Sequence, residues 1–263
     1  VVLLVGLLSI PVEALEPFVL YDDFTGQFID VHKWFGSELK TGDVVNLENV
    51  RMITGGYLRM VNVSYSDQNS DSDHNVGGTR LNFTEGDLVT AIRARALVDK
   101  VSVTGCSTNP FATRARVRLS GFFFNTGVPT PGSAVNDVLA YIDIERRSDS
   151  TEDLNILHAW AMVFECTDSP CLHGNILFSK DLGTVTLKQF ANLSIRWDQA
   201  NHRFIFQLNY NPAIYAPYTV PDTSPPGLSN NKRIEVSPLL PNWTAEPRPM
   251  AMIGAYFDKV YVN

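Results

Sequence analysis

The chain shows no sustained 3.6-residue hydrophobic periodicity, which argues against amphipathic helices as its main elements. A basic tract is also absent and the net charge is −7, so we expect no nucleic-acid partner. Outside residues 1–12, no stretch approaches the roughly 20 apolar residues of a spanning helix, and we expect none. What the 263 residues do contain is 44% hydrophobic side chains, enough for a sizeable core.

Cysteine is scarce, with three residues and no Cys-x-x-Cys spacing, which excludes c-type haem and zinc-ribbon sites. Cys166 and Cys171 bracket the compact polar loop Cys-Thr-Asp-Ser-Pro-Cys. We predict a disulfide between them, which would stabilise the fold by about 2 kcal/mol. Pairing of Cys106 with either one, or three buried thiols, stays open because connectivity is not encoded in spacing.

The first twelve residues form an apolar run. They have the length of the hydrophobic part of a signal peptide, with Val12-Glu13-Ala14 as a cleavage site. An ordered segment would instead be buried, with a gross gain of roughly 12–24 kcal/mol. We predict an exported protein, extracellular or at the cell surface, that self-associates through residues 1–12. The assembly residues would be Val1, Val2, Leu3, Leu4, Val5, Leu7, Leu8 and Ile10.

The rest of the chain is strand-like, with short alternating runs separated by Gly, Pro, Asn and Asp clusters. The predicted strands are 18–23, 44–47, 57–63, 79–83, 88–97, 113–125, 138–147, 156–165, 176–178, 184–186, 193–197, 203–208, 233–236, 250–255 and 259–262. Proline-rich residues 211–226 and 238–249 are predicted as long loops. We predict an all-β fold, a two-sheet antiparallel β-sandwich, with residues 1–16 as an apolar segment and 17–263 as one domain.

Two neighbouring runs place charges on one face of a strand. Arg114, Arg116 and Arg118 alternate with apolar residues, and so do the polar residues of Tyr141-Ile-Asp143-Ile-Glu145. If these strands pair, the carboxylates of Asp143 and Glu145 can lie opposite the arginines.

Several motifs resemble the concanavalin A-like lectin/glucanase superfamily, a jelly roll of two antiparallel sheets. They are Tyr21-Asp-Asp-Phe24 with Ile29–Trp34, Arg51–Arg59, the Leu193–Leu208 hairpin, and Phe257-Asp-Lys-Val-Tyr-Val262. The resemblance covers residues 18–263, includes uncharacterised exported bacterial proteins, and implies a last strand beside the first. It is specific for fold and weak for function, since lectins, glycosidases and structural domains share this fold.

The resemblance also suggests where catalysis would lie. Family 16 glycoside hydrolases carry Glu-x-Asp-x-Glu on one strand, with the first Glu as nucleophile and the last as acid/base. Here Asp143 and Glu145 match the last two positions and are weak catalytic candidates, whereas Tyr141 stands at the nucleophile position. A tyrosine without a partner base is a poor nucleophile, so we expect no enzyme activity.

One loop resembles the first half of a calcium-binding loop. Asp67, Asn69, Asp71 and Asp73 place oxygen ligands at alternate positions. Ser72 and Gly78 depart from that pattern, so a polar loop without metal is the alternative. Apart from Ca²⁺ here, we expect no cofactor.

Together these patterns predict a non-catalytic exported β-sandwich with a structural or assembly role, such as a filament or surface-layer subunit. A lectin-like carbohydrate-binding protein with a glycan partner is the alternative. A degenerate family 16-type hydrolase is a third hypothesis.

Overall fold

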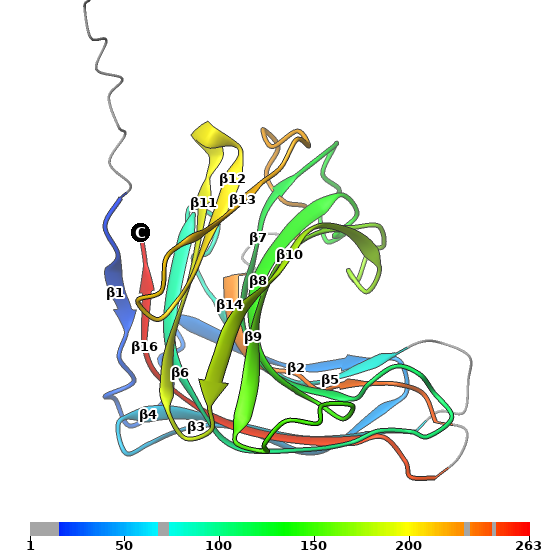
Figure 1. Ribbon diagram of the computed structural model, residues 1–263. Helices are drawn as coiled ribbons and strands as arrows, with labels where there is room; N and C mark the ends of the chain where they lie inside the picture. Colours follow the sequence, from blue (N-terminus) through cyan, green and yellow to red (C-terminus); the bar gives the residue numbers. More distant parts are fainter. Residues whose placement is uncertain (1–15, 68–73, 229–231, 244–245) are drawn as a thin grey trace, which may run out of the picture.

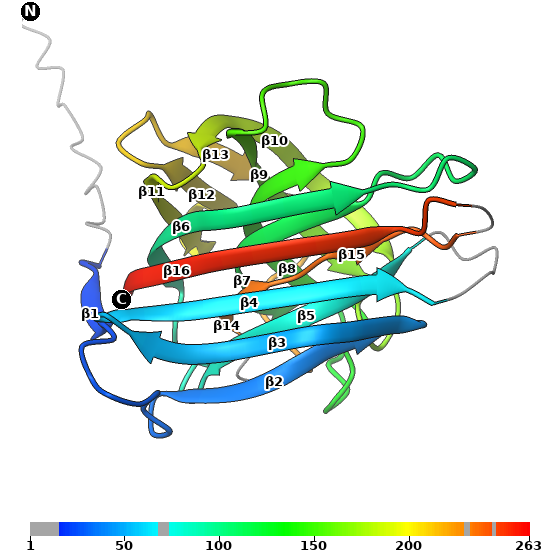
Figure 2. The same ribbon diagram turned by 90° about the horizontal axis from the view of Figure 1, so that it is seen from below.

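The computed structural model describes residues 16–67, 74–228, 232–243 and 246–263, which form two antiparallel sheets packed face to face (Figures 1 and 2). This confirms the predicted β-sandwich. Sheet A has the order β13-β12-β11-β6-β16-β4-β3, with β1 also paired to β16. Its strands are β1 (Val19–Asp22), β3 (Val44–Thr54), β4 (Tyr57–Ser66), β6 (Ala91–Thr104), β11 (Phe190–Asp198), β12 (Arg203–Leu208), β13 (Ile214–Pro217) and β16 (Met250–Val262).

Sheet B has the order β10-β9-β8-β7-β14-β5-β15, with β2 also paired to β5. Its strands are β2 (Trp34–Thr41), β5 (Asn75–Phe83), β7 (Arg114–Asn125), β8 (Asp137–Arg147), β9 (Ile156–Cys166), β10 (Gly174–Thr186), β14 (Lys232–Val236) and β15 (Leu239–Leu240). A short 3₁₀ turn, η1 (Gln199–Asn201), joins β11 to β12.

The main core lies between the two sheets. Alternating residues of β7 and β8 enter it, among them Val117, Leu119 and Ile142, all fully buried. Phe204, Phe206 and other aromatic side chains face them from sheet A. Because alternate positions point to opposite faces, the intervening residues of β7 and β8 lie on the outer face of sheet B.

The first and last strands lie side by side, as the superfamily resemblance implies. Val19 pairs with Val262 and Leu20 with Tyr261 in an antiparallel register (Figure 1). The same corner ties the sheets together, because Trp34 Nε1 at the start of β2 donates a 2.7 Å hydrogen bond to Asp22 Oδ2 at the end of β1. The predicted concanavalin A-like fold is therefore present in the chain's own topology.

Several predicted boundaries were wrong at sheet edges. The short runs 176–178 and 184–186 are parts of one edge strand, β10, whose pairing with β9 is interrupted by bulges that hide the alternation. Strand β2 was missed because its sequence, Trp-Phe-Gly-Ser-Glu-Leu-Lys-Thr, is polar and contains glycine. The two proline-rich loops contain the short strands β13 and β15.

Two predicted sites lie partly or wholly outside the described residues. The assembly residues fall within 1–15, and Asn69, Asp71 and Asp73 fall within 68–73. Asp67 is described and forms an ion pair with Arg248. Among the described residues, no group of three or more His, Cys, Asp or Glu side chains is placed to hold a metal ion, and no helix is long and apolar enough to cross a membrane.

Candidate functional site

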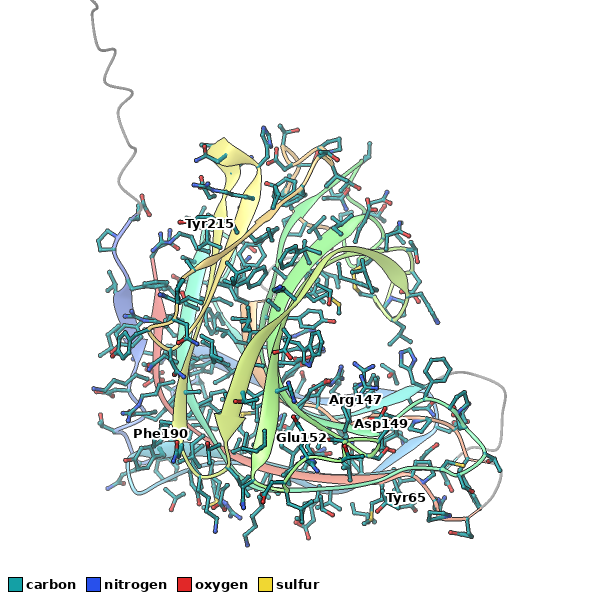
Figure 3. All side chains as sticks on the ribbon, in the orientation of Figure 1. Tyr65, Arg147, Asp149, Glu152, Phe190 and Tyr215 are labelled. Carbon is teal, nitrogen blue, oxygen red and sulfur yellow. A yellow bond between two sulfur atoms is a disulfide. The ribbon has the colours of Figure 1, made fainter. Side chains whose placement is uncertain are left out.

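The outer face of sheet B carries an open cleft of about 760 Å³. Its floor comes from β5, β14, β7 and β8, and loops and β2 form its sides. The labelled Arg147–Asp149 ion pair lies at the end of β8 (Figure 3). The volume falls in the range of small-molecule and cofactor sites.

A row of charges of alternating sign crosses the cleft floor. Glu235 of β14 is the register partner of Arg80 on β5 and of Arg118 on β7. Arg118 is in turn the register partner of Asp143 on β8. The Arg118 guanidinium forms a bidentate interaction with Asp143: Nε donates to Oδ1 at 2.6 Å and Nη2 donates to Oδ2 at 2.7 Å. Glu235 lies 3.6 Å from Arg118 Nε. Such bidentate pairs are geometrically specific, so the row holds its members in place.

The arginines of the floor are anchored through Nε. Arg80 donates to Ser37 Oγ at 2.7 Å, Arg116 to the Ser237 carbonyl at 2.9 Å, and Arg233 to Ser120 Oγ at 3.2 Å. Tethering Nε fixes the plane of each guanidinium. The terminal nitrogens of these groups are not used by these three hydrogen bonds.

Arg114 differs from the other four arginines. Its Nε is buried and has no hydrogen-bond partner in the described structure. Its nearest carboxylate is Glu145, with Nη1 to Oε2 at 3.7 Å, and its side chain is one-third exposed. Arg114 is therefore the least constrained arginine of the cleft.

The other end of the cleft is apolar. Phe122, Leu139 and Phe164 come from β7, β8 and β9, where they are register partners. Leu172 and Leu228 close this end from two loops. Along β8 the cleft thus passes from apolar side chains, through Tyr141, to the arginines.

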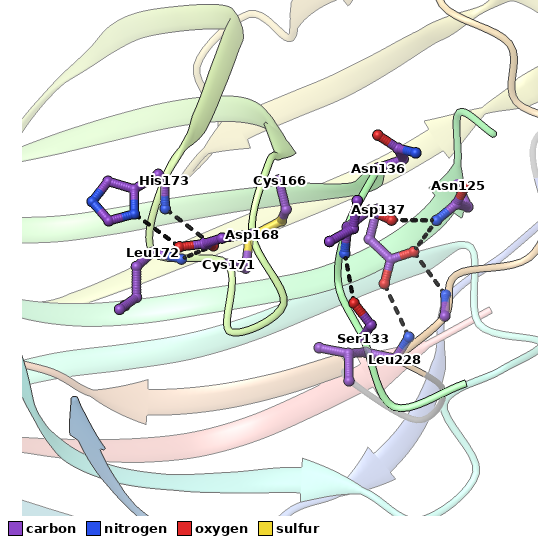
Figure 4. The surroundings of a disulfide bond; sticks show 12 residues. Asn125, Ser133, Asn136, Asp137, Cys166, Asp168, Cys171, Leu172, His173 and Leu228 are labelled. Carbon is purple, nitrogen blue, oxygen red and sulfur yellow. Dashed lines mark hydrogen bonds and ion pairs between the residues drawn. A yellow bond between two sulfur atoms is a disulfide. The ribbon is translucent and has the colours of Figure 1, made fainter. Parts of the chain in front are cut away.

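Two aspartates hold those loops (Figure 4). Asp168 Oδ1 accepts the Leu172 amide at 2.7 Å. Asp137 accepts the amides of Gly227 and Leu228 at 2.7 and 2.9 Å. The disulfide Cys166–Cys171 closes the first loop, which confirms that prediction. Cys106 is buried outside the disulfide, with Sγ 3.1 Å from Thr108 Oγ1.

Burial shifts the pKa values of the charged floor. It lowers the pKa of Arg233 to about 10, and, together with repulsion from Arg118, it lowers the pKa of Arg116. Burial acts to raise the pKa of Glu235, but Arg233 and Arg118 outweigh it and lower that pKa. The arginines remain charged at neutral pH, so the floor presents positive charge.

The predicted catalytic candidates lie under this layer of arginines. Asp143 and Glu145 are each 3% exposed, and neither belongs to the side chains that line the cleft in the described structure. Burial, with a contribution from Asp143, raises the pKa of Glu145. Tyr141 does line the cleft, with its ring 3.8 Å from the Arg118 guanidinium carbon.

Sequence reasoning missed three charged members of the floor. Arg80, Arg233 and Glu235 come from β5 and β14, far from β7 in the chain. The alternation Arg233-Ile-Glu235 is visible in the sequence, but it does not reveal which strands are neighbours. Tyr210, Tyr215 and Trp243, aromatic residues in or beside the proline-rich loops, do not belong to the described cleft lining.

No protein-family model matches the chain, and no curated protein matches it either. Solved structures with a similar fold include the GlcNAcα1-4Gal-releasing endo-β-galactosidase of Clostridium perfringens (12% identity, TM-score 0.44, 96% of this chain and 64% of that one). A second is the glycoside hydrolase family 16 endo-glucanase of Bacteroides ovatus (13% identity, TM-score 0.42, 92% of this chain and 98% of that one). A third is the VIP36 exoplasmic/lumenal domain (10% identity, TM-score 0.37, 87% of this chain and 85% of that one).

These matches correct the predicted function. Most of the similar structures are glycoside hydrolases, and an alginate lyase and a lectin-like domain are among the others. None indicates a filament or structural role, so the predicted assembly subunit was wrong. The matches do not favour the lectin-like alternative over the family 16-type hydrolase hypothesis. They also do not support the expectation that the chain is not an enzyme.

Proposed function

We propose that the cleft of sheet B binds a carbohydrate chain. The observation that carries this proposal is the side-by-side arrangement of two surfaces in one cleft. Hydrogen-bonding charged groups such as Arg116 cover one end, and the aromatic and aliphatic side chains of Phe164 and Leu139 cover the other. A sugar has hydroxyl groups that need fixed polar partners and C–H faces that pack on apolar rings, and binding sites combine both.

The cleft is built rigidly enough for such a role. Its floor consists of paired strands, and the two loops at its apolar end are tied by Asp137, Asp168 and a disulfide. Sites on strands position their groups more accurately than sites on free loops, which lowers the entropic cost of binding.

The test is a panel of neutral and acidic oligosaccharides, with binding measured by calorimetry and products by chromatography. Ala112 lines the cleft and is partly exposed, so Ala112→Trp should obstruct part of it and weaken binding. Ala213→Trp is the matched control, since Ala213 is also partly exposed but lies outside the cleft lining. Equal binding by both variants, or no binding by the unaltered chain to any member, would overturn the proposal. Release of shorter products would show that the cleft also cleaves its ligand.

We also propose that the protein is exported. The Cys166–Cys171 disulfide supports this, because disulfides persist in oxidising compartments and are rare in the cytosol. Thiol labelling of the native protein should modify neither Cys166 nor Cys171 before reduction. Labelling of both without reductant would contradict it.

A further inference from the structure

The lining of the cleft carries far more positive than negative charge. Five arginines and Lys40 line it, against two carboxylates, Glu38 and Glu235. The five arginines are Arg80, Arg114, Arg116, Arg118 and Arg233. This excess contrasts with the chain as a whole, whose net charge is −7. A local field of opposite sign to the whole molecule marks a surface that attracts anions.

The buried carboxylates beside the arginines offset part of this charge, but they leave Arg114 and Arg116 without a carboxylate at hydrogen-bond distance. Asp143 lies beneath Arg118, which donates hydrogen bonds to both of its carboxylate oxygens. Arg116 Nη1 lies 3.9 Å from Asp143 Oδ2. Glu145 lies 3.7 Å from Arg114. Both distances exceed a hydrogen bond, so Arg114 and Arg116 have unused capacity for a short charge-assisted bond.

Two arginines on the outer face of sheet A have closer partners than Arg114. On the outer face of sheet A, Arg95 is paired with Asp258 at 2.5 Å and stacks on the Phe190 ring at 4.3 Å. Arg93 lies between the Phe18 and Tyr261 rings, 4.5 and 4.4 Å from their centroids. These arginines have a carboxylate or aromatic partner at close range. Arg95 therefore offers a matched control for Arg114.

Resting on the proposed carbohydrate site, we infer that the cleft selects acidic saccharides, with Arg114 and Arg116 contacting a carboxylate or sulfate group of the chain. The planar guanidinium donates two parallel bonds to either anion, which a neutral hydroxyl cannot accept as well. Because the apolar end lies beyond Tyr141, the neighbouring sugar of the chain packs its C–H face against Phe164 and Leu139. The ligand is thus oriented, with its charged unit at the arginine end.

The test compares four probes of similar length by calorimetry. They are a galacturonate hexamer, a sulfated galactan hexasaccharide that carries no carboxylate, the neutral cellohexaose and a hexaglutamate peptide. We expect one of the two acidic saccharides to bind at least tenfold tighter than cellohexaose, with affinity falling between 50 and 300 mM salt. Which acidic saccharide binds distinguishes the carboxylate from the sulfate.

Arg114→Gln should weaken binding of that saccharide about tenfold, since one charge-assisted bond is lost. Its weak binding of cellohexaose should fall by a smaller factor, because a neutral hydroxyl loses no charge-assisted bond, and Arg95→Gln should behave like the unaltered chain. Arg80→Gln provides a second cleft variant if Arg114→Gln fails to fold, as checked by thermal unfolding.

Each other outcome overturns a distinct claim. Equal affinity for cellohexaose and the acidic saccharides, unaffected by Arg114→Gln, overturns acid selection and leaves the carbohydrate site standing. Tightest binding of hexaglutamate overturns the carbohydrate site and leaves only a general anion cleft. Binding of none of the four overturns acid selection, and the wider oligosaccharide panel then decides the proposed function.

Discussion

At the residue scale, burial decides how much an Arg–Asp ion pair contributes to stability. Two Arg–Asp pairs in this chain have the same bidentate geometry but opposite surroundings. Arg118–Asp143 is almost fully buried, whereas the Asp149 side chain of the Arg147–Asp149 pair is 55% exposed (Figure 3). A buried charge that loses its partner cannot be solvated by water, and an exposed one can.

Asp143→Asn should therefore destabilise the protein by about 3–5 kcal/mol, because it leaves the Arg118 guanidinium buried without its carboxylate. Asp149→Asn is the matched control and should cost less than about 1 kcal/mol. Chemical denaturation of both variants at pH 7 measures the two losses. Similar losses would show that the buried row does not depend on this pair.

Glu145→Gln should have the opposite effect at high pH. Burial raises the pKa of Glu145, so its charged form is less favourable in the folded chain than in the unfolded one. Stability from this group is greatest at low pH and is lost as pH rises from the ordinary pKa of 4.5 through the raised one. The variant should unfold a few degrees higher at pH 8 and show no gain at pH 4, by calorimetry. A lower melting temperature at pH 8 would contradict this.

At the scale of elements, the edge strand β10 shows how a polar pair can hold an irregular strand. β10 pairs with β9 through two bulges, which leave gaps in the ladder. His158 of β9 bridges across, with Nδ1 2.9 Å from Asp181 of β10 and Nε2 2.7 Å from Glu152 of the preceding loop. Partial burial lowers the pKa of His158, but the two carboxylates outweigh it and raise that pKa above its ordinary value.

This bridge should make the β9–β10 pairing depend on pH. A raised pKa means that the stabilisation is fully present below pH 6.5 and is lost as pH rises through the folded-state pKa. Backbone amides of β10 should therefore exchange hydrogen faster, relative to those of β11, at pH values above that pKa. His158→Gln should remove this extra pH dependence, and its persistence in the variant would show that another group is responsible.

At the scale of the whole molecule, the corner between β1 and β2 joins the two sheets. Trp34 is 2% exposed, packs edge-on against Phe83 at 4.8 Å and donates its indole N–H to Asp22. Because β1 is also the partner of β16, this contact links the start of the chain to its end. Long-range contacts of this kind set the cooperativity of an all-β fold.

Trp34→Phe should cost about 2–3 kcal/mol, since it removes ring volume from the core and leaves an Asp22 oxygen without its donor. Trp243→Phe is the control, because Trp243 Nε1 has no hydrogen-bond partner in the described structure. The smaller loss expected for Trp243→Phe can be measured by urea denaturation. Equal losses would mean that the corner hydrogen bond does not stabilise the fold.

What the sequence determined by itself is local. Period-2 alternation sorted Arg114, Arg116 and Arg118 onto one face of β7 and the Asp143 and Glu145 side chains onto one face of β8, and short Cys spacing predicted the disulfide. Strands at sheet edges were harder, because bulges and a polar composition disguise them.

Only the tertiary structure decided which strands are neighbours and what each face meets. It placed Arg233 and Glu235 beside β7 and Arg80 one strand further away. It also buried the two candidate carboxylates under arginines and left a cationic cleft with an apolar end. Alternation specifies the face on which a side chain lies, whereas strand order depends on contacts between residues far apart in the chain. The same alternating charges could have formed an ordinary solvent face. Their position on the outer face of sheet B, beside the strands and loops that line the cleft, made them the floor of a site.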